Sequence, residues 1–164
     1  MKNRVPQTIL FGFIILMIFI TACAKNDSET KNNNTSQEES VKFVVVGGSG
    51  TILTSSDSNT WISENSGTSN LLSDVIYENG TLITIGGVFV DNVSTVLKSS
   101  NGKTWTSITT GTTKILYDVA YGINKYISTG SYGEVITSSD GSSWTLRSSG
   151  TTNQLNGIEY GNTC

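Results

Sequence analysis

The sequence predicts an all-β protein built from about three repeated units, and three observations support this prediction. Three tryptophans lie 44 and 39 residues apart, and each ends a similar Ser-Ser-Asx phrase: Trp61, Trp105 and Trp144. A second phrase recurs with the same spacing and ends in tyrosine: Tyr77, Tyr121 and Tyr160. Beyond residue 40, no stretch combines helical periodicity with good helix formers. Self-similarity at a period of about 40 residues is typical of architectures that stack or ring repeated units.

The third repeat shows the expected strands most clearly. Short apolar or alternating runs, separated by Gly- and Asn-rich turns, predict strands at 116–121, 125–129, 134–138 and 144–147. Units of four antiparallel strands at this period are the blades of a β-propeller. We therefore expect residues 41–164 to form propeller blades of four antiparallel strands, about three units in all.

The N-terminus carries the features of an export signal. Residues 1–4 are cationic, and residues 8–20 are almost wholly apolar, a length that suits export better than membrane spanning. The following Ile20-Thr21-Ala22-Cys23 resembles the lipobox of bacterial lipoproteins. The resemblance implies a signal peptide over 1–22 and a diacylglycerol on Cys23, which would anchor the chain at the extracytoplasmic face of the cell membrane. The alternative is an uncleaved signal anchor.

Residues 23–40 follow as a polar segment with almost no apolar side chain, which predicts a disordered tether. Loss of residues 1–22 would remove Lys2 and Arg4 and change the formal charge from −3 to −5. An acidic chain lacks the basic face that nucleic acids require, so we expect no nucleic-acid partner. Such a chain also has no electrostatic attraction to anionic lipid, so the acyl anchor alone would hold it at the membrane.

The Ser-Ser-Asp-Gly-x-x-Trp phrase resembles the Asp-box, or BNR, repeat, and is especially similar to repeats of photosystem II assembly factors. The resemblance covers residues 42–160, although the phrase is one residue shorter than the consensus and has Asn in its second copy. A short Asx side chain can accept backbone N–H groups within a turn, and the Trp can be buried between sheets. We expect a structural role for the following residues: Asp57, Trp61, Asn101, Trp105, Asp140 and Trp144.

The resemblance implies that these turns lie away from the usual ligand face, which the second-to-third-strand and blade-to-blade connections share. One second-to-third-strand connection, 87–94, is five residues longer than its equivalents. An insertion in one repeat often lies on the binding face. The candidate ligand contacts are Phe89, Asp91 and Asn92 in this insertion and Tyr132 in the matching connection of the third repeat. The alternative is a tolerated insertion with no ligand.

Composition argues against most catalytic chemistry. The chain has no His and only two Cys, so we expect no metal site, no cofactor and no His-based triad. A sialidase binds its carboxylate substrate with three arginines, whereas Arg147 is the only arginine after residue 22. A glycosidase, which uses a pair of carboxylates, is not excluded, because Asp74, Asp118 and Glu159 are available. We expect a non-enzymatic module that binds a protein or cell-surface glycan, with a fragment of a carbohydrate-active propeller enzyme as the alternative.

The number of repeats is small for a closed ring, because propellers typically have 4–8 blades. The repeats begin at a second strand and end at 155–160, which we expect to form the first strand of a fourth unit. Two interpretations follow: a truncated propeller, or a homodimer that completes a six-bladed ring. Cys164, outside the cytoplasm, is available for an intermolecular disulfide.

Overall fold

The computed structural model describes residues 40–161 with gaps at 89 and 91–92. These residues form eleven β-strands and two short 3₁₀ turns, with no α-helix among them. No helix in this part of the chain is long and apolar enough to span a bilayer. The predictions for residues 1–22, the tether at 23–39 and Cys23, together with those for Phe89, Asp91, Asn92 and Cys164, lie outside the described residues.

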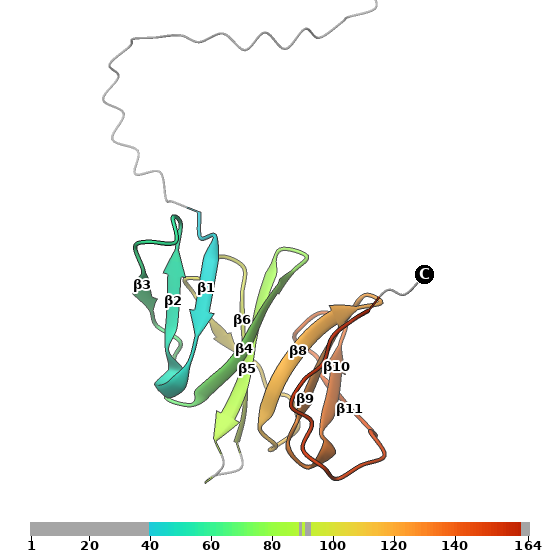
Figure 1. Cartoon of the computed structure of the whole chain (residues 1–164). Helices are drawn as coiled ribbons and strands as arrows, with labels where there is room; N and C mark the ends of the chain where they lie inside the picture. Colours follow the sequence, from blue (N-terminus) through green and yellow to red (C-terminus); the bar gives the residue numbers. More distant parts are fainter. Residues whose placement is uncertain (1–39, 89, 91–92, 162–164) are drawn as a thin grey trace, which may run out of the picture. The chain divides into compact units, whose positions relative to one another are not determined.

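The strands form three antiparallel sheets that follow one another along the chain (Figure 1). Sheet 1 has three strands: β1 (Phe43–Val46), β2 (Ile52–Ser55) and β3 (Ile62–Glu64). Sheet 2 has four: β4 (Leu71–Glu78), β5 (Thr81–Val88), β6 (Val93–Ser99) and β7 (Thr106–Ser107). Sheet 3 has four: β8 (Leu116–Gly122), β9 (Lys125–Gly130), β10 (Val135–Ser138) and β11 (Thr145–Arg147).

Each sheet is a meander in which consecutive strands pair through short turns. Sheets 2 and 3 begin with an inner strand, β4 and β8 respectively, and these two strands lie against each other. Each inner strand contains a register shift at the same repeat position, between Leu72 and Asp74 in β4 and between Leu116 and Asp118 in β8. Such bulges redirect the following side chain, and here the following residue is an aspartate in both strands.

The strand boundaries expected for the third repeat agree with β8–β11 to within one residue, but two other expectations fail. The insertion at 87–94 is not wholly a loop, because Gly87 pairs with Ser94 and Val88 with Val93, which lengthens the β5–β6 ladder. The segment 155–160 is not a strand. It has the sequence of an inner strand, but the described residues provide no second strand to pair with it.

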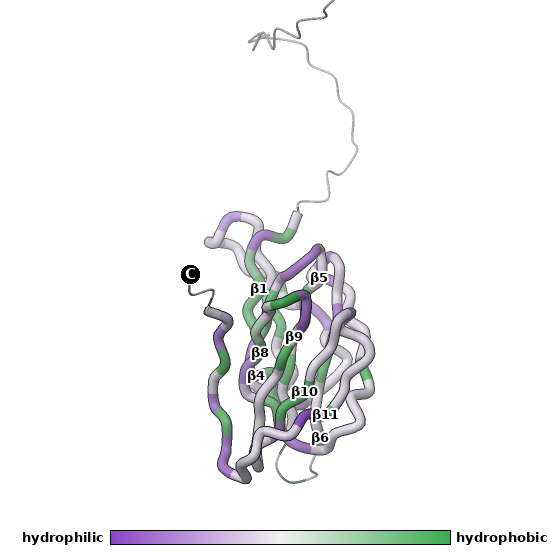
Figure 2. Tube along the Cα trace, turned by 90° about the vertical axis from the view of Figure 1, so that its right-hand side faces the viewer, coloured by the Kyte–Doolittle hydropathy of each residue, from purple (hydrophilic) through white to green (hydrophobic). Residues whose placement is uncertain are grey.

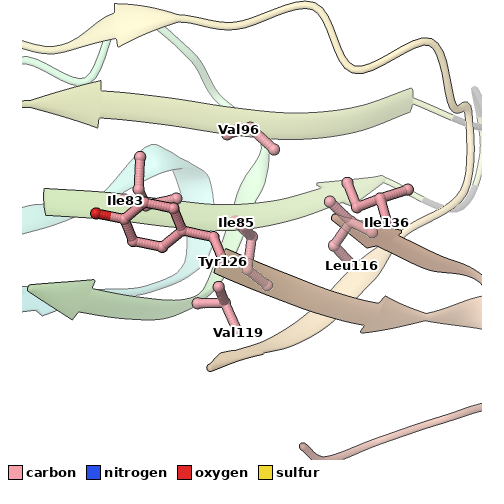
Figure 3. Packing of buried hydrophobic residues seen from close by; sticks show 7 residues of the cluster. All are labelled: Ile83, Ile85, Val96, Leu116, Val119, Tyr126 and Ile136. Atoms are coloured by element: carbon pink, nitrogen blue, oxygen red, sulfur yellow. The ribbon is translucent and has the colours of Figure 1, made fainter. Parts of the chain in front are cut away.

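The core lies between the sheets. A cluster of seven buried side chains joins sheets 2 and 3 (Figure 3): Ile83, Ile85, Val96, Leu116, Val119, Tyr126 and Ile136. A smaller cluster of Ile52, Leu72 and Leu97 joins sheets 1 and 2. Trp144 packs against the first cluster and Trp105 against the second, so each of these two tryptophans lies at an interface between sheets. Burial of these apolar side chains is the main favourable term that holds neighbouring sheets together.

Candidate functional site

The connections between β-strands gather at two opposite ends of the sheets. Figure 1 shows the β1–β2 and β9–β10 connections and the end of β5 at one end, and the β4–β5 and β8–β9 turns at the other. We call the first end the loop face. It also receives the sheet-to-sheet connections 65–70 and 110–114, together with 149–153 after β11. Tyr132 lies on this face.

The sheet-to-sheet connections share one hydrogen-bond pattern. Ser66, Thr110 and Ser149 each accept the backbone N–H two residues later, at 3.3–3.4 Å. The threonine hydroxyls at Thr68, Thr112 and Thr151 do the same at 3.0–3.1 Å. These hydroxyl–backbone turns fix the connections locally. Their hydroxyl groups are therefore engaged within the chain and are poor candidates for the main ligand contacts.

The β1–β2 and β9–β10 connections pack tightly on those turns. Each is a single 3₁₀ turn, Gly48–Gly50 or Ser131–Gly133. Gly50 donates its N–H to the Asn70 carbonyl at 2.8 Å, and Ser149 donates its hydroxyl to the Gly133 carbonyl at 2.7 Å. These contacts fix the backbone positions of the two 3₁₀ turns on the loop face.

Tyr132 is the most distinctive residue on the loop face. Its backbone is left-handed, with φ of 57°, and its side chain is 67% exposed. A left-handed conformation costs a non-glycine residue about 1–2 kcal/mol. The equivalent residue of the first repeat is Ser49, with φ of 55°, so the turn itself does not require an aromatic side chain.

A cation and a second tyrosine accompany Tyr132. Lys114 Nζ lies 4.6 Å from the centroid of the Tyr132 ring, which is within cation–π range. The hydroxyl of Tyr117, on the bulge of β8, is buried, and Ser131 is its nearest side-chain polar partner. Burial also raises the pKa of Tyr117. Tyr132, Lys114 and Tyr117 make up the first candidate site, which combines an exposed aromatic ring, a cation and a buried phenol.

The structure places only one of the four predicted ligand contacts. Tyr132 lies on the loop face as expected, whereas Phe89, Asp91 and Asn92 fall outside the described residues. Val90, at the tip of the same connection, is exposed. Lys114 and Tyr117 were not among the predicted contacts. Lys114 follows a repeated Thr-Gly-Thr phrase, and its charge was the one signal that could have indicated it.

The Asx turns, at Asp57, Asn101 and Asp140, have a shared internal geometry. The Asx Oδ1 accepts the N–H groups two and three residues later, at 2.8 Å in the first and third turns and 3.0 Å in the second. These N–H groups lower the pKa of Asp57 to about 2 and lower that of Asp140 well below its usual range. Asn101 makes the same bonds without a charge, so the turn geometry does not need a carboxylate.

A second candidate site lies on the inner strands. Val119 donates its N–H to Asp74 Oδ2 at 3.0 Å, and Ile158 donates its N–H to Asp118 Oδ2 at 2.7 Å. Each aspartate therefore links its own inner segment to the next one along the chain. Burial raises the pKa of Asp74, and the adjacent Asp118 carboxyl raises it further.

The inner-strand pair differs from a typical catalytic pair in what its oxygens contact. The carboxylates bind backbone N–H groups of successive segments, which is a structural contact. Glu159, the third predicted carboxylate, is exposed. Among the described residues, no group of three or more His, Cys, Asp or Glu side chains is arranged to hold a metal ion.

Comparison with known proteins identifies the fold. No protein-family model and no curated protein sequence matches the chain. Among solved structures, the β-propeller YCF48 bound to D1 peptide superposes with a TM-score of 0.52 at 18% sequence identity. The match covers 76% of this chain but 43% of that one, so this chain spans less than half the length of its structural neighbour. The described part of the chain is an open β-propeller.

The propeller fold gives the sheets and faces their usual names. The three sheets are blades, and β4 and β8 are the inner strands of the second and third blades. The first blade has three strands and lacks an inner strand among the described residues. Function is not implied by the fold, because propellers support many unrelated activities. The site residues must therefore carry the functional argument.

Proposed function

We propose that the chain is a lipid-anchored, extracytoplasmic propeller module that binds an extended peptide segment of a protein partner on its loop face. No catalysis is expected. The anchor would be Cys23, with residues 23–40 as the tether. The binding site would be centred on Tyr132.

One observation carries this proposal: Tyr132 exposes a large aromatic ring from a strained backbone position where the first repeat has serine. Residues in sparsely populated backbone regions concentrate at binding sites, where the rest of the fold holds them in place. Exposed tyrosines also supply rigid, amphipathic contact area at small entropic cost. Local turn chemistry explains the left-handed backbone but not the choice of side chain.

The surrounding groups suit a peptide ligand. Lys114, 4.6 Å from the ring centroid, would attract an acidic side chain or a terminal carboxylate of the peptide. The Tyr132 ring would pack against an apolar or aromatic neighbour in the same peptide. YCF48, whose fold is similar, has been solved in complex with a D1 peptide, which supports a peptide as the ligand class.

Replacement of Tyr132 by alanine is expected to weaken peptide binding at least tenfold, because it removes the exposed ring without touching the core. The measurement uses the full lipidated chain in detergent micelles, screened against a combinatorial peptide library and an array of bacterial cell-envelope glycans. Lys114→Ala should weaken binding of acidic peptides more than of neutral ones. Ser49→Ala, at the equivalent turn of the first repeat, is the matched control and should leave affinity unchanged.

Several outcomes would contradict this function. If Tyr132→Ala and Ser49→Ala bind the selected peptides with equal affinity, Tyr132 is not part of the binding site. If the chain selects only glycans, the ligand is not a peptide. The enzyme alternative is tested by Asp74→Asn and Asp118→Asn, both of which should retain peptide binding. Glycosidase activity that these two substitutions abolish would support the alternative instead.

Replacement of Cys23 by serine is expected to release the protein from the membrane fraction, because it removes the sulfur to which the acyl chains would attach. The measurement is fractionation of cells grown with a labelled fatty acid, which should label the original chain and not the variant. Membrane retention of an unlabelled variant would favour the uncleaved signal anchor.

A further inference from the structure

Within the described residues, the first blade has an open edge where the other two blades have an inner strand. In the second and third blades, β4 pairs with β5 and β8 pairs with β9. In the first blade, β1 occupies the position of β5 and β9, and it pairs only with β2 among the described residues. Phe43 and Val45 on β1 are exposed, as is expected for a blade that has neither a preceding blade nor an inner strand among the described residues.

The segment 155–160 has the features of an inner strand without a blade. Leu155 donates its N–H to the Gly130 carbonyl at 3.0 Å, as Leu72 of β4 does to Gly47. The bond from Ile158 to Asp118 likewise repeats the bond from Val119 of β8 to Asp74. Figure 2 shows this segment as an extended tube with alternating hydropathy. It therefore lies beside β8 as β8 lies beside β4, at the place of a fourth inner strand.

A cavity marks the place of the missing inner strand of the first blade. Its volume is about 540 Å³, and β1 and β4 line it through Val44 and through Val75, Ile76 and Tyr77. Between the second and third blades, the β4–β5 hairpin occupies the equivalent space. There Tyr126 donates its hydroxyl to the Glu78 carbonyl at 2.9 Å, and Asn79 donates to the Tyr121 hydroxyl at 2.6 Å.

The contrast between Tyr77 and Tyr121 shows what is missing. These residues are one repeat apart at the same position of β4 and β8. Tyr121 is half-buried beneath the preceding hairpin and its ring lies 4.8 Å from that of Tyr126, whereas Tyr77 is 63% exposed at the cavity. A strand and turn seated in the cavity would cover Tyr77.

We propose that a second copy of this chain supplies residues 155–160 to the open edge of β1, and that the exchange is reciprocal. Two copies of three blades would give a ring of six, within the usual range of 4–8. The arrangement has two-fold symmetry, in which each copy both donates and receives the segment. The inference depends on the blade pattern alone and is independent of the proposed peptide ligand.

The repeat fixes the register of the exchanged strand. Val75 pairs with Thr84 in the second blade and Val119 with Ser128 in the third, which places Ile158 opposite Val45. The pairs Tyr77–Leu82 and Tyr121–Tyr126 likewise place Tyr160 opposite Phe43. Backbone bonds to an exposed edge would supply affinity, and these side-chain pairs would supply specificity.

Charge at the cavity fits the same donor segment. Glu159 takes the repeat position of Ile76, whose side chain packs against the cluster between its own blade and the following one. In the exchanged arrangement this carboxylate would therefore point toward the wall of the cavity, which carries Lys42 and Lys103. The opposite signs of donor and acceptor favour this docking over a neutral strand.

The test is a pair of cysteines in the full chain, produced with its anchor and kept in detergent micelles. In a Cys164→Ser background, Val45→Cys with Ile158→Cys should form a disulfide that links two chains, because paired residues across strands have the required spacing. Val45→Cys with Glu159→Cys is the control and should not link, since adjacent strand residues point to opposite faces. The readout is a non-reducing gel.

Light scattering of the unmodified full chain provides the second measurement. A protein mass of two chains is expected, and Glu159→Lys should weaken dimerisation at least tenfold while it leaves the exposed donor segment free to fold. A one-chain mass at high concentration, or a Val45–Ile158 disulfide within a single chain, would overturn the proposal. A dimer in which Val45→Cys and Ile158→Cys do not form a disulfide between chains would also overturn the proposal, because its interface would lie elsewhere.

Discussion

Trp144→Ala should lower the free energy of unfolding by about 3 kcal/mol, whereas Trp61→Ala should lower it by less than about 1 kcal/mol in dilute protein. The two tryptophans occupy the same repeat position, one at the end of each Asx turn. Urea unfolding monitored by far-UV circular dichroism, at a concentration where the chain is monomeric, gives both values. Equal losses would contradict the expectation.

The difference arises from what each indole contacts. Trp144 packs against the cluster between the second and third blades and donates its Nε1–H to the Gly141 carbonyl at 3.3 Å. Trp61 is 39% exposed, and its ring contact is with Phe43 of its own blade at 6.5 Å. Trp105 has the environment of Trp144, with an Nε1–H bond to Gly102 at 2.9 Å, so Trp105→Ala should behave like Trp144→Ala.

Trp61 also connects this prediction to the proposed ring. Trp105 and Trp144 pack against clusters shared by two blades, whereas the first blade has no preceding blade among the described residues. A third blade from a second copy would cover Trp61. The cost of Trp61→Ala should therefore increase with protein concentration, because association stabilises the folded chain by mass action.

The sequence predicted the blades well because their determinants are local. In the third repeat, β9, its turn and β10 follow one another. Ser138, Asp140 and Trp144 set the next turn through bonds within a few residues. Local hydroxyl and Asx chemistry of this kind is visible in the order of residues alone. The observed β9–β11 boundaries consequently lie within one residue of the expected ones.

The features that failed depend on partners distant in the sequence. The alternation in 155–160 indicates a strand, but a strand needs an edge to pair with, and the described chain does not provide one. The extended β5–β6 ladder is a different case, because its partners are local: Gly87 and Ser94 are residue types typical of turns, yet they pair with each other. The contact of Lys114 with Tyr132 joins two separate connections.

The contacts of the inner-strand aspartates also could not be predicted from the sequence. Asp74 and Asp118 recur at one repeat position in the sequence, but this recurrence does not show which groups the carboxylates contact. The bond from Val119 to Asp74 spans 45 residues, and that from Ile158 to Asp118 spans 40. Only the packing of successive inner segments reveals that each carboxylate reaches the backbone of the next.

Gly133→Ala should lower the free energy of unfolding by more than about 3 kcal/mol, whereas Gly150→Ala should lower it by about 1 kcal/mol. Both glycines have left-handed backbones, with φ of 71° and 76°, so alanine suffers the same conformational strain at each. At Gly133 an added Cβ would overlap the Thr151 carbonyl oxygen, while at Gly150 it would meet open space. The difference between the two variants in urea unfolding therefore isolates the close packing of the loop face.

The first repeat offers an independent replicate of this comparison. Gly50, with φ of 67°, approaches the Thr68 carbonyl as Gly133 approaches Thr151, and Gly67, with φ of 73°, faces open space as Gly150 does. Gly50→Ala should thus cost more than Gly67→Ala by a similar margin. Similar losses for all four variants would mean that the 3₁₀ turns can move away from the sheet-to-sheet connections. The turn that carries Tyr132 is held by the contact of Gly133 with Thr151. If that turn can move, the backbone does not hold the Tyr132 ring in one position for binding.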